Sequence, residues 1–290
     1  MKDECALGIH SRGAEMIIDF TVGMLGTLGI VVLIWKYQEY KKTSKNEEML
    51  DRAGNLLQKV LCNVPLSHGI FHALKVLEHT YRALKQCPEL TDNTKLAIML
   101  AALLHDADDR KYFPKNKSYE NARMITRQIC PQAEDLVIEM IGYVSCSSNG
   151  SSIPSDAMKR PWLLYPRWAD RLEAIGYIGI VRAWEYTLET NRPLFTATTQ
   201  RARNVDELGH IANADRYTDY VSSGGKSASM IDHYYDKLLH ICDFETDNIY
   251  LRDKARERRN PLVNICLIFG EHGQLDIDLF DRARRRTEYE

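Results

Sequence analysis

From residue 47 to residue 269, apolar residues recur at the three- and four-residue spacing of helices that bury one face. Proline-containing breaks such as Asn63-Val64-Pro65 and Cys87-Pro88 interrupt this pattern. No segment alternates apolar and polar residues as a half-buried strand does, so we expect an all-α fold. The expected helices cover residues 47–61, 67–84, 91–106, 119–129, 131–141, 167–188, 230–241 and 249–269.

One long segment between these helices, residues 190–228, shows no clear periodicity. It contains the sequence Ser222-Ser223-Gly224-Gly225, and glycine and serine clusters are typical of loops. We therefore expect residues 190–228 to form a long, partly mobile insertion.

The amino terminus has a different composition, because Phe20–Trp35 is a run of apolar and small residues without a charge. Extended to residues 16–35, it reaches the length of about 20 residues that a helix needs to cross a membrane. Trp35 and the lysines after it suit the cytosolic interface. We expect residues 16–35 to anchor the protein in a membrane, with the remainder in the cytosol. The alternative is a buried helix of a soluble cytoplasmic protein.

The overall composition argues against two classes of protein. The formal net charge is -2, whereas a broad nucleic-acid interface needs an excess of basic residues. The seven cysteines are odd in number and never spaced as Cys-x-x-Cys, which argues against a disulfide framework and a zinc ribbon. Free thiols indicate a reducing compartment.

Candidate chemistry starts where the apolar run Leu96–Leu104 ends at His105 and Asp106. Two further carboxylates and two cations follow within residues 108–111. Ionisable groups at the end of a buried helix cost free energy unless something compensates them. A divalent metal would do so, because imidazole and carboxylate suit it. The alternative is a helix end that emerges into solvent.

Two distant residues could complete such a metal site. His72 lies near the start of the second expected helix of the domain, and Asp170 near the start of the helix over 167–188. Two imidazoles and two carboxylates suit Mn²⁺ or Mg²⁺, and also Fe²⁺ or Zn²⁺. Spacing alone does not decide whether His72, His105, Asp106 and Asp170 meet.

Five strings, in order, resemble the HD-domain metal-dependent phosphohydrolase superfamily, and within it the small bacterial-type enzymes that act on nucleoside triphosphates. The resemblance covers about residues 47–273. Two departures concern substrate preference: Lys75 replaces an arginine, and Trp168 replaces a carboxylate. The strings are His68…His72…Lys75-Val76, Ala102-Leu103-Leu104-His105-Asp106…Asp109-Arg110-Lys111-Tyr112, Ala169-Asp170-Arg171-Leu172-Glu173-Ala174-Ile175-Gly176, His233-Tyr234-Tyr235-Asp236-Lys237-Leu238-Leu239 and Ala255-Arg256-Glu257-Arg258.

The resemblance implies a helical-bundle HD domain over residues 47–273, between a hydrophobic segment with a basic linker (1–46) and a charged, solvated tail (274–290). It implies a metal-dependent hydrolase of a nucleotide or another small phosphorylated substrate, foremost a (d)NTP pyrophosphohydrolase. A 5′-nucleotidase or phosphodiesterase is the alternative within the superfamily. A catalytically silent, membrane-tethered nucleotide-binding or scaffold protein is the alternative of another class. An oligomer is compatible with all of these.

The resemblance also implies roles for single residues. Asp109 would be a general acid or base, although its alternative is a solvent-exposed carboxylate, as we expect for Asp108. His68 would contact the phosphate or support a ligand, or else cap its helix. The metal ligands would be His72, His105, Asp106 and Asp170, and the phosphate-binding cations Lys75, Lys111, Lys237 and Arg258, each of which could instead be a solvated surface cation.

Overall fold

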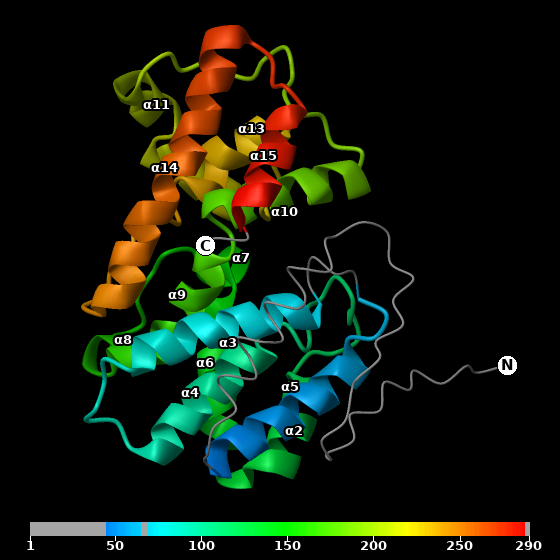
Figure 1. Ribbon diagram of the computed structural model, residues 1–290, viewed down its shortest axis with the longest axis vertical. Coiled ribbons are helices and arrows are strands. Elements are labelled where there is room, and N and C mark those ends of the chain that lie inside the picture. Colours follow the sequence, from blue (N-terminus) through cyan, green and yellow to red (C-terminus); the bar gives the residue numbers. More distant parts are fainter. Residues whose placement is uncertain (1–44, 65–68, 288–290) are drawn as a thin grey trace, which may run out of the picture.

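A computed structural model of the protein describes residues 45–64 and 69–287 (Figure 1). The expected membrane segment, residues 16–35, and the candidate site residue His68 lie outside these described residues. Among the helices that the structure does describe, none combines the length and the apolar character needed to cross a membrane.

The all-α prediction is confirmed, because the described residues form helices and no strand. Most of the expected helices are present with boundaries shifted by a few residues. The helices are α2 (Lys45–Val60), α3 (Ile70–Leu84), α4 (Asp92–Leu104), α5 (Glu120–Ile129), α6 (Glu134–Val144), α7 (Cys146–Asn149), α8 (Ser155–Lys159), α9 (Tyr165–Leu172), α10 (Gly176–Glu189), α11 (Val205–Ile211), α12 (Ala214–Ser222), α13 (Met230–His233), α14 (Ile249–His272) and α15 (Asp278–Thr287), with 3-10 turns η2 (Pro131–Ala133) and η3 (Pro161–Leu164) and one π-helical turn, η4 (Tyr234–Leu238).

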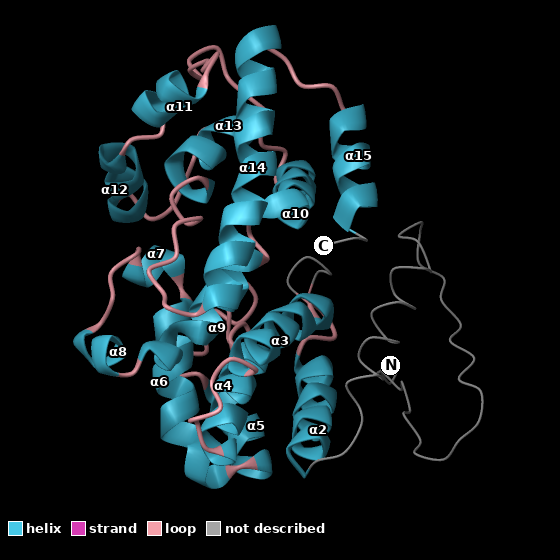
Figure 2. Cartoon of the chain, turned by 60° about the vertical axis from the view of Figure 1, so that its left-hand side comes forward, coloured by secondary structure: helices cyan, strands magenta, loops and turns pink. Residues whose placement is uncertain are grey.

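The helices form two groups, one containing α2 to α9 and the other α10 to α15 (Figures 1 and 2). In the first group α4 is the central helix and contacts α2, α3, α6 and α9. All residues from Leu96 to Leu104 are buried, as expected for a helix that is apolar on every side. Thr91 begins this helix, since its side chain accepts a hydrogen bond from the Thr94 amide at 3.2 Å.

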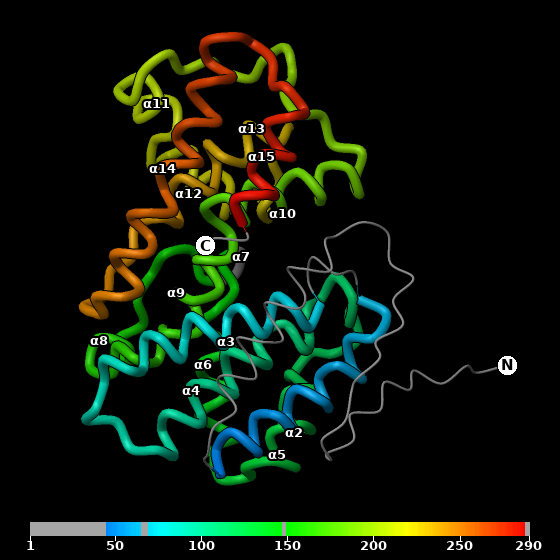
Figure 3. Tube along the Cα trace, in the orientation of Figure 1, coloured from blue at the N-terminus to red at the C-terminus, as the bar shows by residue number. Residues whose placement is uncertain are grey.

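The prediction of a single helix over residues 167–188 is wrong, because the chain breaks between α9 and α10. At this break the chain passes from the first group of helices to the second (Figure 3). Gly176 has φ = 77°, a conformation that favours glycine. A Cβ atom at Gly179 would lie 2.4 Å from the carbonyl oxygen of Ala174. The break therefore depends on glycine at both positions, and helical periodicity does not reveal it.

Residues 190–228, expected to form a long, partly mobile insertion, contain two helices, α11 and α12. Asn204 and Asn213 cap α11 and α12 by accepting hydrogen bonds from the amides of Glu207 and Arg216. Arg216 then forms an ion pair with Asp232 at 2.7 Å, which ties α12 to α13. Short helices that are held by caps and ion pairs carry little hydrophobic periodicity, so the sequence pattern missed them.

The expectation of a charged, solvated tail over residues 274–290 is wrong for α15, because this helix packs against α10. The ring of Phe280 is buried and stacks on Trp184 with 4.4 Å between centroids. Arg284, expected to be solvated, forms an ion pair with Glu185 at 3.0 Å. The two buried apolar residues of α15 lie on one side of a strongly charged helix, and they are enough to hold this helix against the domain.

Candidate metal centre and its cavity

Helices α3, α4 and α9 meet in a small cluster of three fully buried residues, Val76, Ala102 and Ala169. Each of them lies close in sequence to a predicted metal ligand: His72 precedes Val76 by one helical turn, and Asp170 directly follows Ala169. Side chains of this size allow the three backbones to approach each other closely. The cluster therefore fixes the distance between the elements that carry the ligands.

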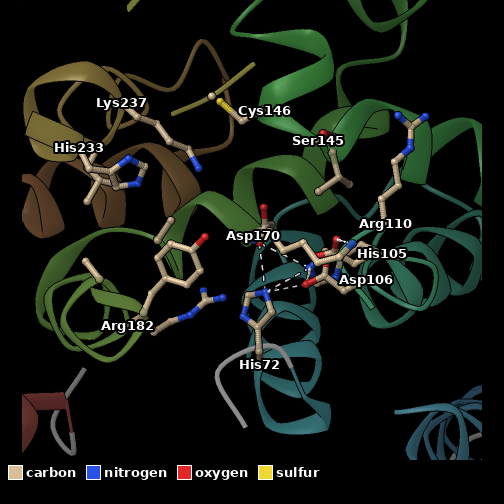
Figure 4. A pocket seen from close by; sticks show the side chains of 18 of the residues that line it. His72, His105, Asp106, Arg110, Ser145, Cys146, Asp170, Arg182, His233 and Lys237 are labelled. Atoms are coloured by element: carbon tan, nitrogen blue, oxygen red, sulfur yellow. Dashed lines mark hydrogen bonds and ion pairs between the residues drawn. The ribbon is translucent and has the colours of Figure 1, made fainter. Parts of the chain in front are cut away.

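The four predicted metal ligands come together at this junction (Figure 4). The Nε2 atoms of His72 and His105 are 3.2 Å apart. Asp170 Oδ1 lies 3.2 Å from His72 Nε2 and 3.5 Å from His105 Nε2. Asp106 Oδ2 lies 3.6 Å and 3.4 Å from the same two nitrogens.

Among these residues, the separations of His72, His105 and Asp106 fit one bound metal ion. Two ligand atoms at about 2.1 Å from an ion, with an angle of about 90–110° between them, lie about 3.0–3.4 Å apart. One ligand atom from each of His72, His105 and Asp106 lies within 4.8 Å of the other two. His105 donates from Nδ1 to the Ala102 carbonyl at 2.8 Å, which leaves Nε2 as the coordinating nitrogen when the ring is neutral.

The electrostatics of the cluster favour a positive charge between the carboxylates. Burial opposes a charged His105, but Asp106 and Asp170 outweigh it and raise the pKa of this imidazole well above its usual range. Burial and the charge of Arg182 lower the pKa of His72, so this ring stays neutral, the form that binds metals. Carboxylates placed in this way attract a cation, either a proton on His105 or a metal ion.

A cavity of about 520 Å³ opens directly from the four ligands. Its volume is in the range of pockets that hold small organic ligands. Three tyrosines, Tyr119, Tyr186 and Tyr220, contribute aromatic surface. Six cations line it, namely Arg110, Lys111, Lys117, Arg182, Arg192 and Lys237.

Asp109, the predicted acid or base, lines this cavity. Its Oδ1 accepts a hydrogen bond from the Lys111 amide at 2.9 Å, which fixes the side chain in the turn after α4. Burial raises the pKa of this carboxyl, and the bond and charge of Lys111 only partly oppose the rise. Asp108, expected to face solvent, instead accepts from the amides of Asn121 and Ala122 at 3.0 Å and 2.9 Å and caps α5.

The predicted phosphate-binding cations separate into two pairs. Lys111 and Lys237 line the cavity, whereas Lys75 and Arg258 do not. Lys75 pairs with Glu78 at 3.3 Å on the same helix. The Arg258 prediction conflicts with burial: only 3% of this residue is exposed, and its Nη1 donates to the Leu172 carbonyl at 2.6 Å and to Glu173 at 3.1 Å.

Arg258 thus belongs to a buried polar network behind Asp170. Glu173 accepts from Arg258 and from His79 Nε2, at 3.1 Å and 3.0 Å, and the Tyr250 hydroxyl lies 2.5 Å from His79 Nδ1. Burial acts against an ionised Glu173, but His79 and Arg258 hold the pKa of this carboxyl well below its usual range. The network joins α14 to the end of α9 that carries a metal ligand.

Sequence patterns missed the cavity wall that α10 and the following loop provide. Gly179, Arg182, Ala183 and Tyr186 line the cavity at spacings of three and four residues, so they occupy one face of α10. This spacing is visible in the sequence, but the prediction of one continuous helix over residues 167–188 hides the separate face that α10 presents to the cavity. Arg192 follows in the aperiodic segment, where no pattern marks it.

One known protein is similar enough in sequence to show the family to which this chain belongs. No protein-family model matches the chain. The uncharacterized protein L803 of Acanthamoeba polyphaga mimivirus is 36% identical over 219 residues, which cover 70% of this chain and 88% of the viral protein. The chain belongs to the family of this viral protein.

Solved bacterial structures share the fold at lower identity. A protein from Lactobacillus plantarum is 20% identical with a TM-score of 0.57, over 79% of this chain and 99% of its own. The Lin1889 protein from Listeria innocua is 21% identical with a TM-score of 0.51, over 80% and 100%. An HD-superfamily hydrolase from Bacillus thuringiensis is 18% identical with a TM-score of 0.54, over 80% and 100%. This chain therefore has the same fold as these bacterial proteins, one of which is an HD-superfamily hydrolase.

Proposed function

We propose that this protein is a metal-dependent phosphohydrolase that acts on nucleotides, and foremost a (d)NTP pyrophosphohydrolase. The observation that carries the proposal is the opening of the His72–His105–Asp106–Asp170 cluster into a cavity lined by six cations. A cationic cavity beside a metal site suits a substrate with several phosphates. The fold shared with the HD-superfamily hydrolase from Bacillus thuringiensis supports hydrolysis in general.

The residues of the cavity have separate roles in the proposed reaction. One divalent ion held by the four ligands would polarise a phosphoryl oxygen and make water a better nucleophile. Asp109 would act as general base and accept the proton of the attacking water at its carboxylate. Arg182, which lies beside His72 and donates to the Glu173 carbonyl at 2.9 Å, would stabilise charge on the attacked phosphoryl group.

We propose a triphosphate rather than a monophosphate as the substrate because of the number of cations that line the cavity. A monophosphate would neutralise only part of the positive charge of Lys111, Arg192 and Lys237 in addition to that of Arg182. A chain of phosphates carries enough negative charge to neutralise these further cations in addition to Arg182. A 5′-nucleotidase activity has less support for this reason.

The test is to incubate the full-length protein with Mn²⁺ and a panel of nucleoside tri-, di- and monophosphates, and to identify the products. Pyrophosphate together with the nucleoside monophosphate is the expected result. Orthophosphate released from monophosphates would replace the proposal by a nucleotidase. No turnover with Mn²⁺, Mg²⁺, Fe²⁺ or Zn²⁺, together with nucleotide binding, would favour a catalytically silent nucleotide-binding protein.

A further inference from the structure

Glu173 lies at the break between α9 and α10, three residues after the metal ligand Asp170. Its backbone amide donates to the Asp170 carbonyl at 3.0 Å, and its backbone carbonyl accepts from Arg182 Nη1 at 2.9 Å. Arg182 lines the cavity, and Figure 4 shows its guanidinium group directed towards the ring of His72. The backbone of Glu173 therefore connects a metal ligand to a cation beside the metal cluster.

The side chain of Glu173 fixes this backbone to two other helices. The carboxylate is buried and accepts from His79 Nε2 of α3 at 3.0 Å and from Arg258 Nη1 of α14 at 3.1 Å. The same Arg258 nitrogen donates to the Leu172 carbonyl at 2.6 Å, so the peptide bond before Glu173 is held as well. His79 lies two helical turns after His72, which means that α3 carries both a metal ligand and a residue that binds Glu173.

The buried network has no direct access to the substrate. Among the described residues, those that line the cavity do not include Glu173, His79 or Arg258. Any effect on the reaction passes through a cavity residue, and Arg182 is one that the Glu173 carbonyl binds directly. A carbonyl oxygen holds a guanidinium group in place but carries no full charge that would neutralise it. Burial and then the charge of Arg182 lower the pKa of His72, which shows that this charge acts on the metal cluster.

The break in the chain is the reason why such a connection is needed. Arg182 belongs to α10, whereas Asp170 belongs to α9, and Gly176 with φ = 77° separates the two helices. Arg182 therefore does not share a rigid helix with a metal ligand. A misplacement of about 1 Å at a reacting centre can lower a rate about 10²-fold. The bond to the Glu173 carbonyl supplies the missing constraint.

We propose that Glu173 is a positioning residue of the active site. Its carboxylate anchors the break between α9 and α10 to α3 and α14, and its carbonyl thereby holds Arg182 beside the metal cluster. The inference rests on the proposed function for the part that Arg182 plays in the reaction. The dependence of the place of Arg182 on Glu173 is a matter of geometry and can be measured without turnover.

A double-mutant cycle on the hydrolysis of a nucleoside triphosphate tests this connection. Rates are expressed per bound Mn²⁺, at a temperature where circular dichroism shows the variants folded. Glu173→Gln should lower kcat about tenfold or more and change KM less than about threefold, because the transition state loses a well-placed cation. Arg182→Gln should lower kcat about 10²-fold. In the Arg182→Gln background, Glu173→Gln should change kcat less than about twofold, because the residue through which it acts is gone.

A role of Glu173 in stability alone predicts a different result, namely an unchanged rate per bound Mn²⁺. Glu134→Gln is the matched control, since Glu134 also accepts from two side chains, Arg123 and Arg127, but does not line the cavity. It should leave kcat within about twofold of wild type. Arg258→Lys keeps the buried positive charge but loses the fork of donors, and should lower kcat about threefold. It takes the place of Glu173→Gln if that variant does not fold.

The place of Arg182 gives a readout that does not depend on activity. In crystal structures of the full-length wild type and Glu173→Gln, each with Mn²⁺, the Arg182 guanidinium group should differ in position relative to His72 by about 1 Å or more. An unmoved guanidinium group would overturn the inference, as would equal losses of kcat for Glu173→Gln in both backgrounds. If no nucleotide is hydrolysed, the proposed function fails, and the two crystal structures still decide whether Glu173 positions Arg182.

Discussion

The two sides of the cavity are built in different ways. The metal side comes from α3, α4 and α9, long or fully buried helices joined by the small residues Val76, Ala102 and Ala169. The opposite side comes from one face of α10, a loop and the π-helical turn η4, and presents Arg192, Lys237 and other polar groups. Apolar packing holds both sides, and the second side depends in addition on caps, ion pairs and cation–aromatic contacts.

This difference matches what each side has to do. Metal ligands must be held within a fraction of an ångström, and close-packed apolar helices resist such displacement. A wall that recognises an anion through long cationic side chains tolerates more variation in its backbone. Changes on the metal side should therefore abolish activity or stability, while changes on the opposite side should act mainly on binding.

The largest effect is expected from Asp106→Ala, which removes one of the two carboxylates of the metal cluster. Bound metal, measured by atomic emission after dialysis against Mn²⁺, should fall below one tenth of the wild-type content. Turnover should fall by about 10³-fold or more. Asp219→Asn, an exposed carboxylate on α12, is the matched control. An Asp106→Ala variant with wild-type metal content would contradict the assigned ligand set.

Asp109→Asn should separate chemistry from metal binding. The amide cannot accept a proton, so kcat should fall by about 10²- to 10⁴-fold. Metal content should stay at the wild-type level, because Asp109 is three residues beyond the ligand Asp106 and bonds to the Lys111 amide. A variant that loses its metal would instead make Asp109 part of the cluster.

The pH dependence sharpens the role of Asp109. Burial raises the pKa of its carboxyl above the ordinary value of 3.8, and the charge of Lys111 partly opposes this rise. As a base, Asp109 acts only when deprotonated, so the activity is lost as the pH falls through the raised pKa. Lys111→Met removes the opposing charge and should move this acidic limb of kcat/KM to higher pH. If the acidic limb does not move in this variant, a group other than Asp109 is responsible for it.

Glu173→Gln tests the buried network behind the metal side. It leaves Arg258 buried without its carboxylate, so the free energy of unfolding should fall by about 3 kcal/mol at pH 7, measured by urea denaturation. His79 and Arg258 hold the pKa of Glu173 below the ordinary value of 4.5. The stabilisation by the ionised form is complete above pH 4.5 and is lost as the pH falls further. The variant should therefore lose less stability than wild type between pH 5 and pH 3.

The smallest effect is expected from Ala102→Leu, which adds volume where α3, α4 and α9 meet. Overpacking of this kind costs about 1–3 kcal/mol of unfolding free energy. Because Ala102 also accepts the His105 hydrogen bond, the affinity for Mn²⁺ should fall together with stability. Ala183→Leu on the opposite side should change stability less, because Ala183 lines the cavity and is only partly buried. If the two variants lose the same unfolding free energy, the two sides of the cavity do not differ in how they are packed.

The metal side was accessible from the sequence because its signals are local. The apolar run Leu96–Leu104 indicates a buried helix, and the resemblance of the strings around His72, His105 and Asp170 to a known family predicts residues that the fold brings together. Arg258 shows the limit of such strings: its sequence context suggested a phosphate contact, but the fold buries it against Glu173. A sequence string does not state which way a side chain points.

The all-α architecture and the central helix follow from the sequence alone, because periodicity reports local burial. The residues that converge at the site follow from the resemblance of short strings to a known family. The break at Gly176, the packing of α15 through Phe280, and the placement of Arg192 against Tyr186 became visible only in the folded chain. These depend on contacts between segments far apart in the chain, and such contacts leave no periodic pattern in either segment.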